Sequence, residues 1–250
     1  MAAEIRPGIH RPDWSVVTRP RAREAILGRD RSRLGLAEKW NQTLAPEQDS
    51  VWRTVLELLA RFGRPPHLRE IGKEAGLSVE NLRVLVSELQ ARDLLGSDAS
   101  ADVILYAYPF TGQETEHRVN LRGRKLHAVC AIDALGIAGM FCADVVIESS
   151  CRACAGSIEI RTAQCGKSLS SVRPGDAVVW YDLAYSGRAA ASCCPAIAFF
   201  CSDAEVQQWL SAQSPQRAGY RLTLDEALEV GRALFEPVLR HNEAKLMSGS

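Results

Sequence analysis

The hydrophobic pattern of the sequence changes once along the chain, and this change limits the folds that the chain can adopt. From residue 49 to residue 96, apolar side chains such as Val51, Val55 and Leu58 recur at helical spacing. From Val119 to Phe200, short β-rich runs alternate with glycine and proline. This segregation predicts an α+β fold, in which an N-terminal helical domain precedes a β-rich core with flanking helices.

The helical part predicts a winged-helix-like domain over residues 49–118. Its first helix should end at Gly63, and Ser78 is placed to cap the third helix. Residues 102–108 can follow as a strand of a wing. The polar side chains of the third helix are a balanced mixture of acidic, basic and amide groups: Glu80, Asn81, Arg83, Glu88, Gln90, Arg92 and Asp93. This balance disfavours binding in a DNA groove and favours a role of the helix in packing.

Residues 1–48 are expected to form a basic, partly ordered N-terminal extension. Pro7, Pro12 and Pro20 interrupt any long helix there, and arginines crowd the stretch that follows. Acidic residues lie among the arginines, so we expect a solvated surface and no nucleic acid partner.

Residues 119–250 are expected to form a cysteine-rich catalytic domain. Four strands are predicted near 145–147, 158–160, 177–181 and 196–200. Two helices should close the chain, one over Asp203 to Ala212 and one after the capping box that begins at Thr223.

Composition excludes several classes of protein. Thirty basic and thirty acidic residues give zero formal charge, so no global field attracts nucleic acid or an anionic membrane. No apolar run approaches the roughly 20 residues of a membrane span, and no secretory signal is visible, so we expect a cytoplasmic protein. All eight cysteines lie in the second half, which favours thiol or metal chemistry over a disulfide framework.

Cys130, Asp133 and Cys193 are the candidate site residues. Two thiolates bind a soft metal, and a nearby carboxyl group can deliver a proton. Cys130 and Asp133 share one face if their segment is helical. Cys193 and Cys194 are adjacent, so on an extended strand only one of them can face the site.

These residues resemble the organomercurial lyase (alkylmercury lyase) family, which has a Cys-x-x-Asp segment and a later Cys-Cys pair followed by two Phe. Here the segments are Cys130-Ala131-Ile132-Asp133 and Cys193-Cys194, with Phe199-Phe200 beyond. The resemblance covers roughly residues 50–240. It implies that Cys193 faces the site, and that Cys194 and Cys151 support the fold. The chain departs from the family pattern at His127 and Val129, where aromatic residues are common, and at Pro195, where a His is common.

The resemblance implies cleavage of the carbon–mercury bond by protonolysis, giving a hydrocarbon and Hg(II). Cys130 and Cys193 would bind the mercury, and Asp133 would help to deprotonate a cysteine and then protonate carbon. No cofactor is expected, because mercury is part of the substrate. The expected partners are organomercurial small molecules, low-molecular-weight thiols and a mercuric reductase.

Other functions stay open at this point. A thiol- or metal-sensing winged-helix regulator would use the same cysteines, and a divergent relative could run another metal-handling or biosynthetic reaction. A cysteine hydrolase would need a histidine as general base, and no histidine of this chain lies in a recognisable base motif. His10 and His67 also lie outside the cysteine-rich half. Cys151, Cys154 and Cys165 could instead hold zinc. No role is assigned to Cys142 or Cys201.

Overall fold

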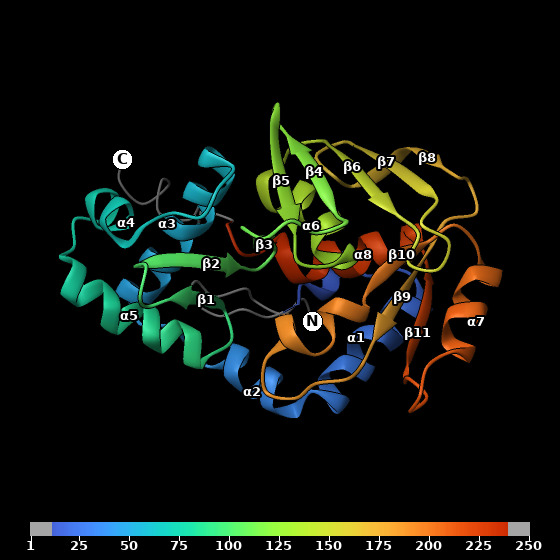
Figure 1. Ribbon diagram of the computed structural model, residues 1–250, viewed down its shortest axis with the longest axis horizontal. Coiled ribbons are helices and arrows are strands. Elements are labelled where there is room, and N and C mark those ends of the chain that lie inside the picture. The colour runs from blue at the N-terminus through green and yellow to red at the C-terminus, as the bar shows by residue number, and fades with distance from the viewer. Residues whose placement is uncertain (1–11, 240–250) are drawn as a thin grey trace.

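Antiparallel strands form two sheets in residues 12–239, the part of the chain that the computed structural model describes (Figure 1). The larger sheet has eight strands in the order β1-β2-β3-β5-β4-β6-β7-β8, and the smaller has three in the order β10-β9-β11. The bounds are β1 (Leu95–Asp98), β2 (Val103–Ala107), β3 (Phe110–Thr111), β4 (Arg118–Leu121), β5 (Arg124–Ala128), β6 (Val145–Ser150), β7 (Ser157–Ala163), β8 (Ser168–Arg173), β9 (Val178–Asp182), β10 (Ala198–Phe200) and β11 (Gly219–Thr223).

Two helices, α6 and α8, lie at the centre of the molecule between the two sheets (Figure 1). The α-helices are α1 (Pro20–Ser32), α2 (Leu34–Asn41), α3 (Pro46–Phe62), α4 (Leu68–Ala75), α5 (Val79–Ala91), α6 (Ala131–Phe141), α7 (Asp203–Ser211) and α8 (Leu224–Phe235). Within residues 12–239 the short 3-10 helices are η1 (Trp14–Val16), η2 (Ala189–Ala191) and η3 (Cys194–Ala196). Over residues 12–239, no helix is both long enough and apolar enough to cross a bilayer.

The predicted α+β character is confirmed. Helices α3, α4 and α5 occupy the stretch where three helices were expected, and Ser78 caps α5 by accepting from the N–H of Asn81. The predicted wing strand is β2, which pairs with β1. The larger sheet continues from β2 through β3 into β5, so hydrogen-bonded strands join the two regions on either side of residue 118. Helices α7 and α8 also form as expected, with the Thr223 capping box at the start of α8.

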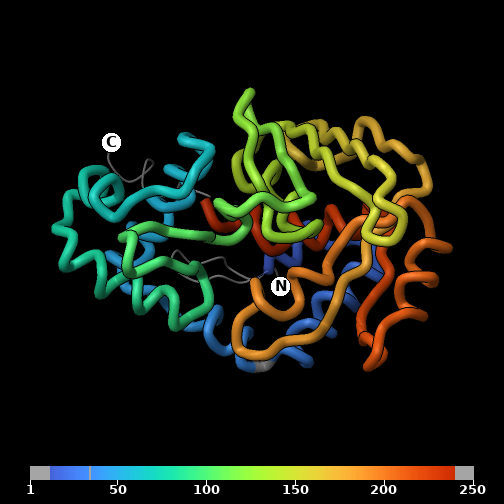
Figure 2. The backbone as a smooth tube through the Cα atoms, in the orientation of Figure 1, coloured from blue at the N-terminus to red at the C-terminus, as the bar shows by residue number. Residues whose placement is uncertain are grey.

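The expectation of a partly ordered extension is wrong for residues 12–48, which carry two packed helices. Pro20 begins α1 instead of breaking it, because the first helical position needs no N–H donor. Ala22, Ala25 and Ile26 are fully buried, and α1 packs on α8 and β11 (Figure 2). Residues 1–11 of the expected extension lie outside the described residues.

An ion pair fixes this N-terminal segment to the core. Arg19 Nη1 lies 2.8 Å from Glu229 Oε1 on α8, and the backbone N–H groups of Thr18 and Arg19 each donate to Glu229 Oε2 at 2.9 Å. The Glu229 carboxylate thereby occupies the N-terminus of α1, where unpaired N–H groups favour an anion. The crowded arginines therefore include structural ones and are not simply a solvated basic arm.

Two glycines allow α6 and α8 to approach closely. A Cβ on Gly136 of α6 would lie 2.4 Å from the Phe235 ring and 2.9 Å from the carbonyl oxygen of Gly231. A Cβ on Gly231 of α8 would lie 2.9 Å from the carbonyl oxygen of Ile132. Backbone atoms cannot move aside as a flexible side chain can, so the contact requires glycine on both helices.

We expect Gly136→Ala to lower the free energy of unfolding by about 1–3 kcal/mol, because the added methyl group overpacks the α6–α8 contact. Denaturant unfolding measures the change. Gly139→Ala is the matched control one turn further along α6, since its Cβ would meet only ordinary contacts from 3.4 Å outward. Gly139→Ala should leave the free energy of unfolding at the wild-type value or raise it by up to about 1 kcal/mol, because alanine favours a helix more than glycine does. Equal stability of the two variants would contradict the proposed packing constraint.

Candidate active site

Cys130 and Asp133 lie at the buried N-terminus of α6, so the segment is helical, which is the condition under which they were expected to lie together. Cys130 is the N-cap residue, and its Sγ accepts from the backbone N–H of Asp133 at 3.5 Å. The side chain of Asp133 in turn accepts from the thiol and the backbone N–H of Cys130. Both residues are buried, with exposed fractions of 2% and 4%. Helix capping therefore places the acid against the thiol.

The cysteine pair is not extended, so the expected division into one inward and one outward side chain does not hold. Cys193 has helical backbone angles, and Cys194 begins η3. The ligand atoms of Cys130, Asp133 and Cys194 all lie within 4.8 Å of one another. Cys193 is fully buried beside them, with its Sγ 3.7 Å from the carbonyl oxygen of Ala189. The expectation that Cys194 points away from the site is thus wrong, because the 3-10 turn directs both sulfurs inward.

Burial controls the protonation of Asp133. It raises the pKa of the carboxyl group to about 8, against the smaller opposing effect of the hydrogen bond from Cys130. One oxygen, Oδ2, is buried without a hydrogen-bond partner in residues 12–239. Asp133 is therefore mainly protonated at neutral pH, which suits a proton donor.

The three thiols differ in acidity. Burial raises the pKa of Cys130 to about 11. The hydrogen bond from Cys194 lowers the pKa of Cys193 to about 7, and the positive charges of Arg33 and Arg29 act in the same direction although burial opposes them. Cys194, which hydrogen-bonds to both Cys130 and Cys193, has a pKa well above its usual value. Cys193 is therefore the thiol that most readily becomes a thiolate.

Arg33 is a site residue that sequence reasoning missed. It lies between α1 and α2, only 4% exposed, and its guanidinium group lies 5.3 Å from the centre of the Tyr181 ring. It donates to the carbonyl oxygen of Asp182, while its Nε has no hydrogen-bond partner within the described chain. Nothing in the local sequence distinguishes Arg33 from Arg31, because only the fold carries it to β9 and the cysteines.

A cavity of about 690 Å³ reaches the cluster at Cys194. Pro195, Val129 and Arg188 contribute to its wall, and an ion pair of 2.5 Å between Arg152 and Glu116 stands at the same cavity. Cys194 is therefore the member of the cluster that lines this cavity.

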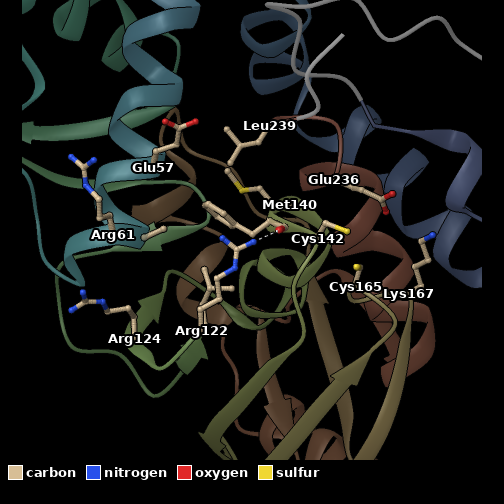
Figure 3. A pocket seen from close by; sticks show the side chains of 14 residues that line it. Glu57, Arg61, Arg122, Arg124, Met140, Cys142, Cys165, Lys167, Glu236 and Leu239 are labelled. Atoms are coloured by element: carbon tan, nitrogen blue, oxygen red, sulfur yellow. Dashed lines mark hydrogen bonds between the residues drawn. The ribbon is translucent and has the colours of Figure 1, made fainter. Parts of the chain in front are cut away.

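A larger cavity, of about 810 Å³, is lined by none of Cys130, Asp133, Cys193 and Cys194 (Figure 3). Its lining includes Cys142 and Cys165, whose side chains lie side by side (Figure 3). The smaller cavity is the better candidate for the reaction because it contains the buried acid's neighbouring thiol, Cys194.

The zinc site predicted from Cys151, Cys154 and Cys165 is wrong in its third ligand, Cys165. Cys165 lies beside Cys142, whereas the sulfur that lies within 4.8 Å of those of Cys151 and Cys154 belongs to Cys201. These residues come together from the loop after β6 and the end of β10, which sequence spacing cannot reveal.

The described histidines do not support a Cys/His hydrolase. His117 is fully engaged in the core, with Nδ1 2.9 Å from Ser149 Oγ, and burial lowers its pKa to about 3. His127 Nδ1 accepts from the backbone N–H of Thr115 at 3.1 Å. His67 caps α4, away from the cysteines, and His10 lies outside the described residues.

Comparisons with known proteins agree on one family. The family description "Alkylmercury lyase" matches residues 110–236. The alkylmercury lyase of Staphylococcus epidermidis is 30% identical over 218 residues, covering 86% of this chain and 94% of that protein. The alkylmercury lyase of Bacillus cereus is 27% identical over 203 residues, covering 80% and 86% respectively. The crystal structure of the mercury-bound form of MerB2 superposes with a TM-score of 0.68 at 25% identity, covering 84% of this chain and 98% of that one. This chain belongs to the alkylmercury lyase family.

Proposed function

We propose that the buried cluster of Cys130, Asp133, Cys193 and Cys194 is where this organomercurial lyase cleaves the carbon–mercury bond. The observation that carries the proposal is the buried Asp133 carboxyl group within 4.8 Å of the sulfurs of Cys130 and Cys194, with one carboxyl oxygen unpartnered within residues 12–239. Thiolates coordinate a soft metal ion, and the neighbouring carboxyl group can donate a proton close to the bound metal.

In the proposed reaction the Cys193 thiolate attacks the mercury of R–Hg⁺ and forms the first sulfur–mercury bond. Asp133 then gives its proton to the carbon as the carbon–mercury bond breaks, which releases R–H. The Cys130 thiol passes its own proton to Asp133 and its sulfur becomes the second mercury ligand. One thiol proton has then moved to carbon, Asp133 is protonated again, and Hg(II) stays on two thiolates without any change of oxidation state.

Arg33 is proposed as a positioning residue for this chemistry. Its buried charge favours the anionic forms of both Cys193 and Asp133. Cys194, hydrogen-bonded to both other thiols, would hold the Cys193 sulfur as a thiolate before substrate arrives.

Turnover requires a way for Hg(II) to leave. We propose that low-molecular-weight thiols remove it by ligand exchange, or that a mercuric reductase accepts it directly. No resident cofactor is invoked, since the mercury enters with the substrate. A reducing cytoplasm, the expected location, keeps the cysteines as thiols.

The function is tested by incubating reduced protein with methylmercury or phenylmercury and excess thiol, and measuring methane or benzene by gas chromatography. Wild type should release hydrocarbon, and Cys130→Ala and Cys193→Ala should not. Cys194→Ala tests the pair directly, and we expect it to retain release at a lower rate. If Cys194→Ala is inactive while Cys193→Ala is active, the roles proposed for these two residues must be exchanged.

Asp133→Asn should slow hydrocarbon release by roughly 10²- to 10⁴-fold, because the amide keeps the shape of the side chain but cannot act as an acid. Binding of inorganic Hg(II) should survive, as the thiols remain. Both quantities are measured on the same preparation, by gas chromatography and by mercury analysis after gel filtration. Release within threefold of wild type would remove Asp133 from the mechanism.

The rate of hydrocarbon release should peak between about pH 7 and pH 8. Below the Cys193 pKa of about 7 the nucleophilic thiolate is lost, and above the Asp133 pKa of about 8 the proton for carbon is lost. Arg33→Gln should move both limbs to higher pH, since the charge of Arg33 lowers both pKa values.

Arg33→Lys is the matched control for this pH dependence, because it keeps the positive charge and should keep the wild-type profile. Circular dichroism shows whether each variant is folded. A folded Arg33→Gln protein whose pH profile superimposes on that of wild type would show that Arg33 has no electrostatic role.

A further inference from the structure

A second group of three thiols lies apart from the proposed catalytic residues. The sulfurs of Cys151, Cys154 and Cys201 all lie within 4.8 Å of one another. The Cys154 and Cys201 sulfurs are 4.0 Å apart, about twice the length of a disulfide bond, so these are free thiols. Cys151 is buried, Cys201 is half-buried and Cys154 is exposed, so the group opens to solvent on one side.

The backbone around Cys151 is already arranged for a thiolate. Backbone N–H groups of Ala153, Cys154 and Cys201 hydrogen-bond to its sulfur, that of Cys201 at 3.4 Å. The loop is held by hydrogen bonds from the N–H of Cys151 to the carbonyl oxygen of Gly156 at 2.8 Å and from the N–H of Ala155 to that of Cys151 at 2.9 Å. Donors that converge on sulfur stabilise negative charge, as they do around metal-bound cysteines.

Gly156 keeps the space beside the two more exposed sulfurs open. A Cβ at this position would lie 3.1 Å from the Cys201 Sγ and 3.3 Å from the Cys154 Sγ. Any larger residue would therefore crowd the place where a ligand would bridge these thiols.

The three cysteine sulfurs determine which cation could bind to this group. Only sulfur is offered, which favours a soft cation over one that prefers oxygen. Structural zinc sites almost always have four ligands, and among the described residues no fourth His, Cys, Asp or Glu joins this group. A soft cation that accepts three thiolate ligands therefore fits this group better than zinc does. Hg(II) is the soft cation that the proposed reaction generates.

We propose that Cys151, Cys154 and Cys201 form a second mercury site, which binds Hg(II) as a three-thiolate complex. Binding forms three sulfur–mercury bonds and releases three thiol protons to solvent, with no change of oxidation state. The assignment of Hg(II) as the cation rests on the proposed function, while the three-thiol geometry does not.

The location of the group is consistent with holding product near its source. Arg152, which follows Cys151 in the loop, lines the cavity that also reaches Cys194. The loop is joined to the strand after the cysteine pair, since the N–H of Arg152 donates to the carbonyl oxygen of Phe199 on β10 at 3.1 Å.

The test is a titration of the reduced, metal-free full chain with inorganic Hg(II) in the presence of glutathione. Mercury per chain is measured after gel filtration, and X-ray absorption at the mercury edge reports the number of sulfur ligands. Wild type should hold one more mercury than Cys154→Ser or Cys201→Ser, and the three-sulfur component should disappear in both variants. The double variant Cys142→Ser/Cys165→Ser is the matched control, which removes the other non-catalytic thiol pair and should behave as wild type in its three-sulfur component.

Equal mercury content and equal coordination in wild type, Cys154→Ser and Cys201→Ser would overturn the proposal. So would a purified protein that carries zinc at these thiols and does not exchange it for Hg(II). Hydrocarbon release in the first turnover is measured alongside and should be unchanged in Cys154→Ser. If wild type releases no hydrocarbon, the lyase mechanism fails, while the mercury count still decides whether the three-thiol site exists.

Discussion

Burial of the Asp133 carboxyl group at the N-terminus of α6 is the interaction on which the site depends. A carboxyl group in water would be ionised at neutral pH and could not donate a proton. Burial raises its pKa to about 8, and in the proposed reaction the neighbouring Cys130 thiol replaces the proton that Asp133 gives to carbon. The site therefore holds an acid and soft-metal ligands in the same enclosed volume.

Keeping that carboxyl group buried requires contributions from distant parts of the chain. Helix α8 covers α6 through a glycine contact that leaves no room for a side chain. The 3-10 turn of the cysteine pair closes the site from another direction, and the junction of α1 and α2 adds the buried charge of Arg33. A defect at the α6–α8 contact would thus affect stability and acidity together.

The cysteines fall into three groups that differ in burial and in neighbours. The group that we propose as catalytic is enclosed and lies next to an acid, which suits bond cleavage. The Cys142 and Cys165 thiols face a large cavity lined by charged residues (Figure 3). The group of Cys151, Cys154 and Cys201 has sulfur ligands only and opens to solvent, which suits holding a cation without chemistry. Differences in burial and in neighbouring groups are therefore the basis for proposing different roles for these thiols.

The sequence by itself determined the elements whose signals are local. Helical spacing and caps located α3, α4, α5, α7 and α8, because hydrophobic period and capping act within a few residues. The three-residue spacing of Cys130 and Asp133 gave them one shared face on condition that the segment is helical, and the structure supplies that helix as α6. The sequence did not predict the N-terminal helices, because proline and clustered arginines are typical of a solvated segment. The partner that pairs with Arg19, Glu229 on α8, lies far along the chain.

Only the tertiary structure decided which distant residues meet. The inward direction of Cys194 depends on a 3-10 turn that two adjacent cysteines do not encode, and the pairing of Cys201 with Cys151 depends on strands that are far apart in the chain. Arg33 reaches the thiols because α1 packs on α8 and β11. Such contacts arise from burying the apolar faces of whole elements against one another, so no local pattern around a single residue can specify them.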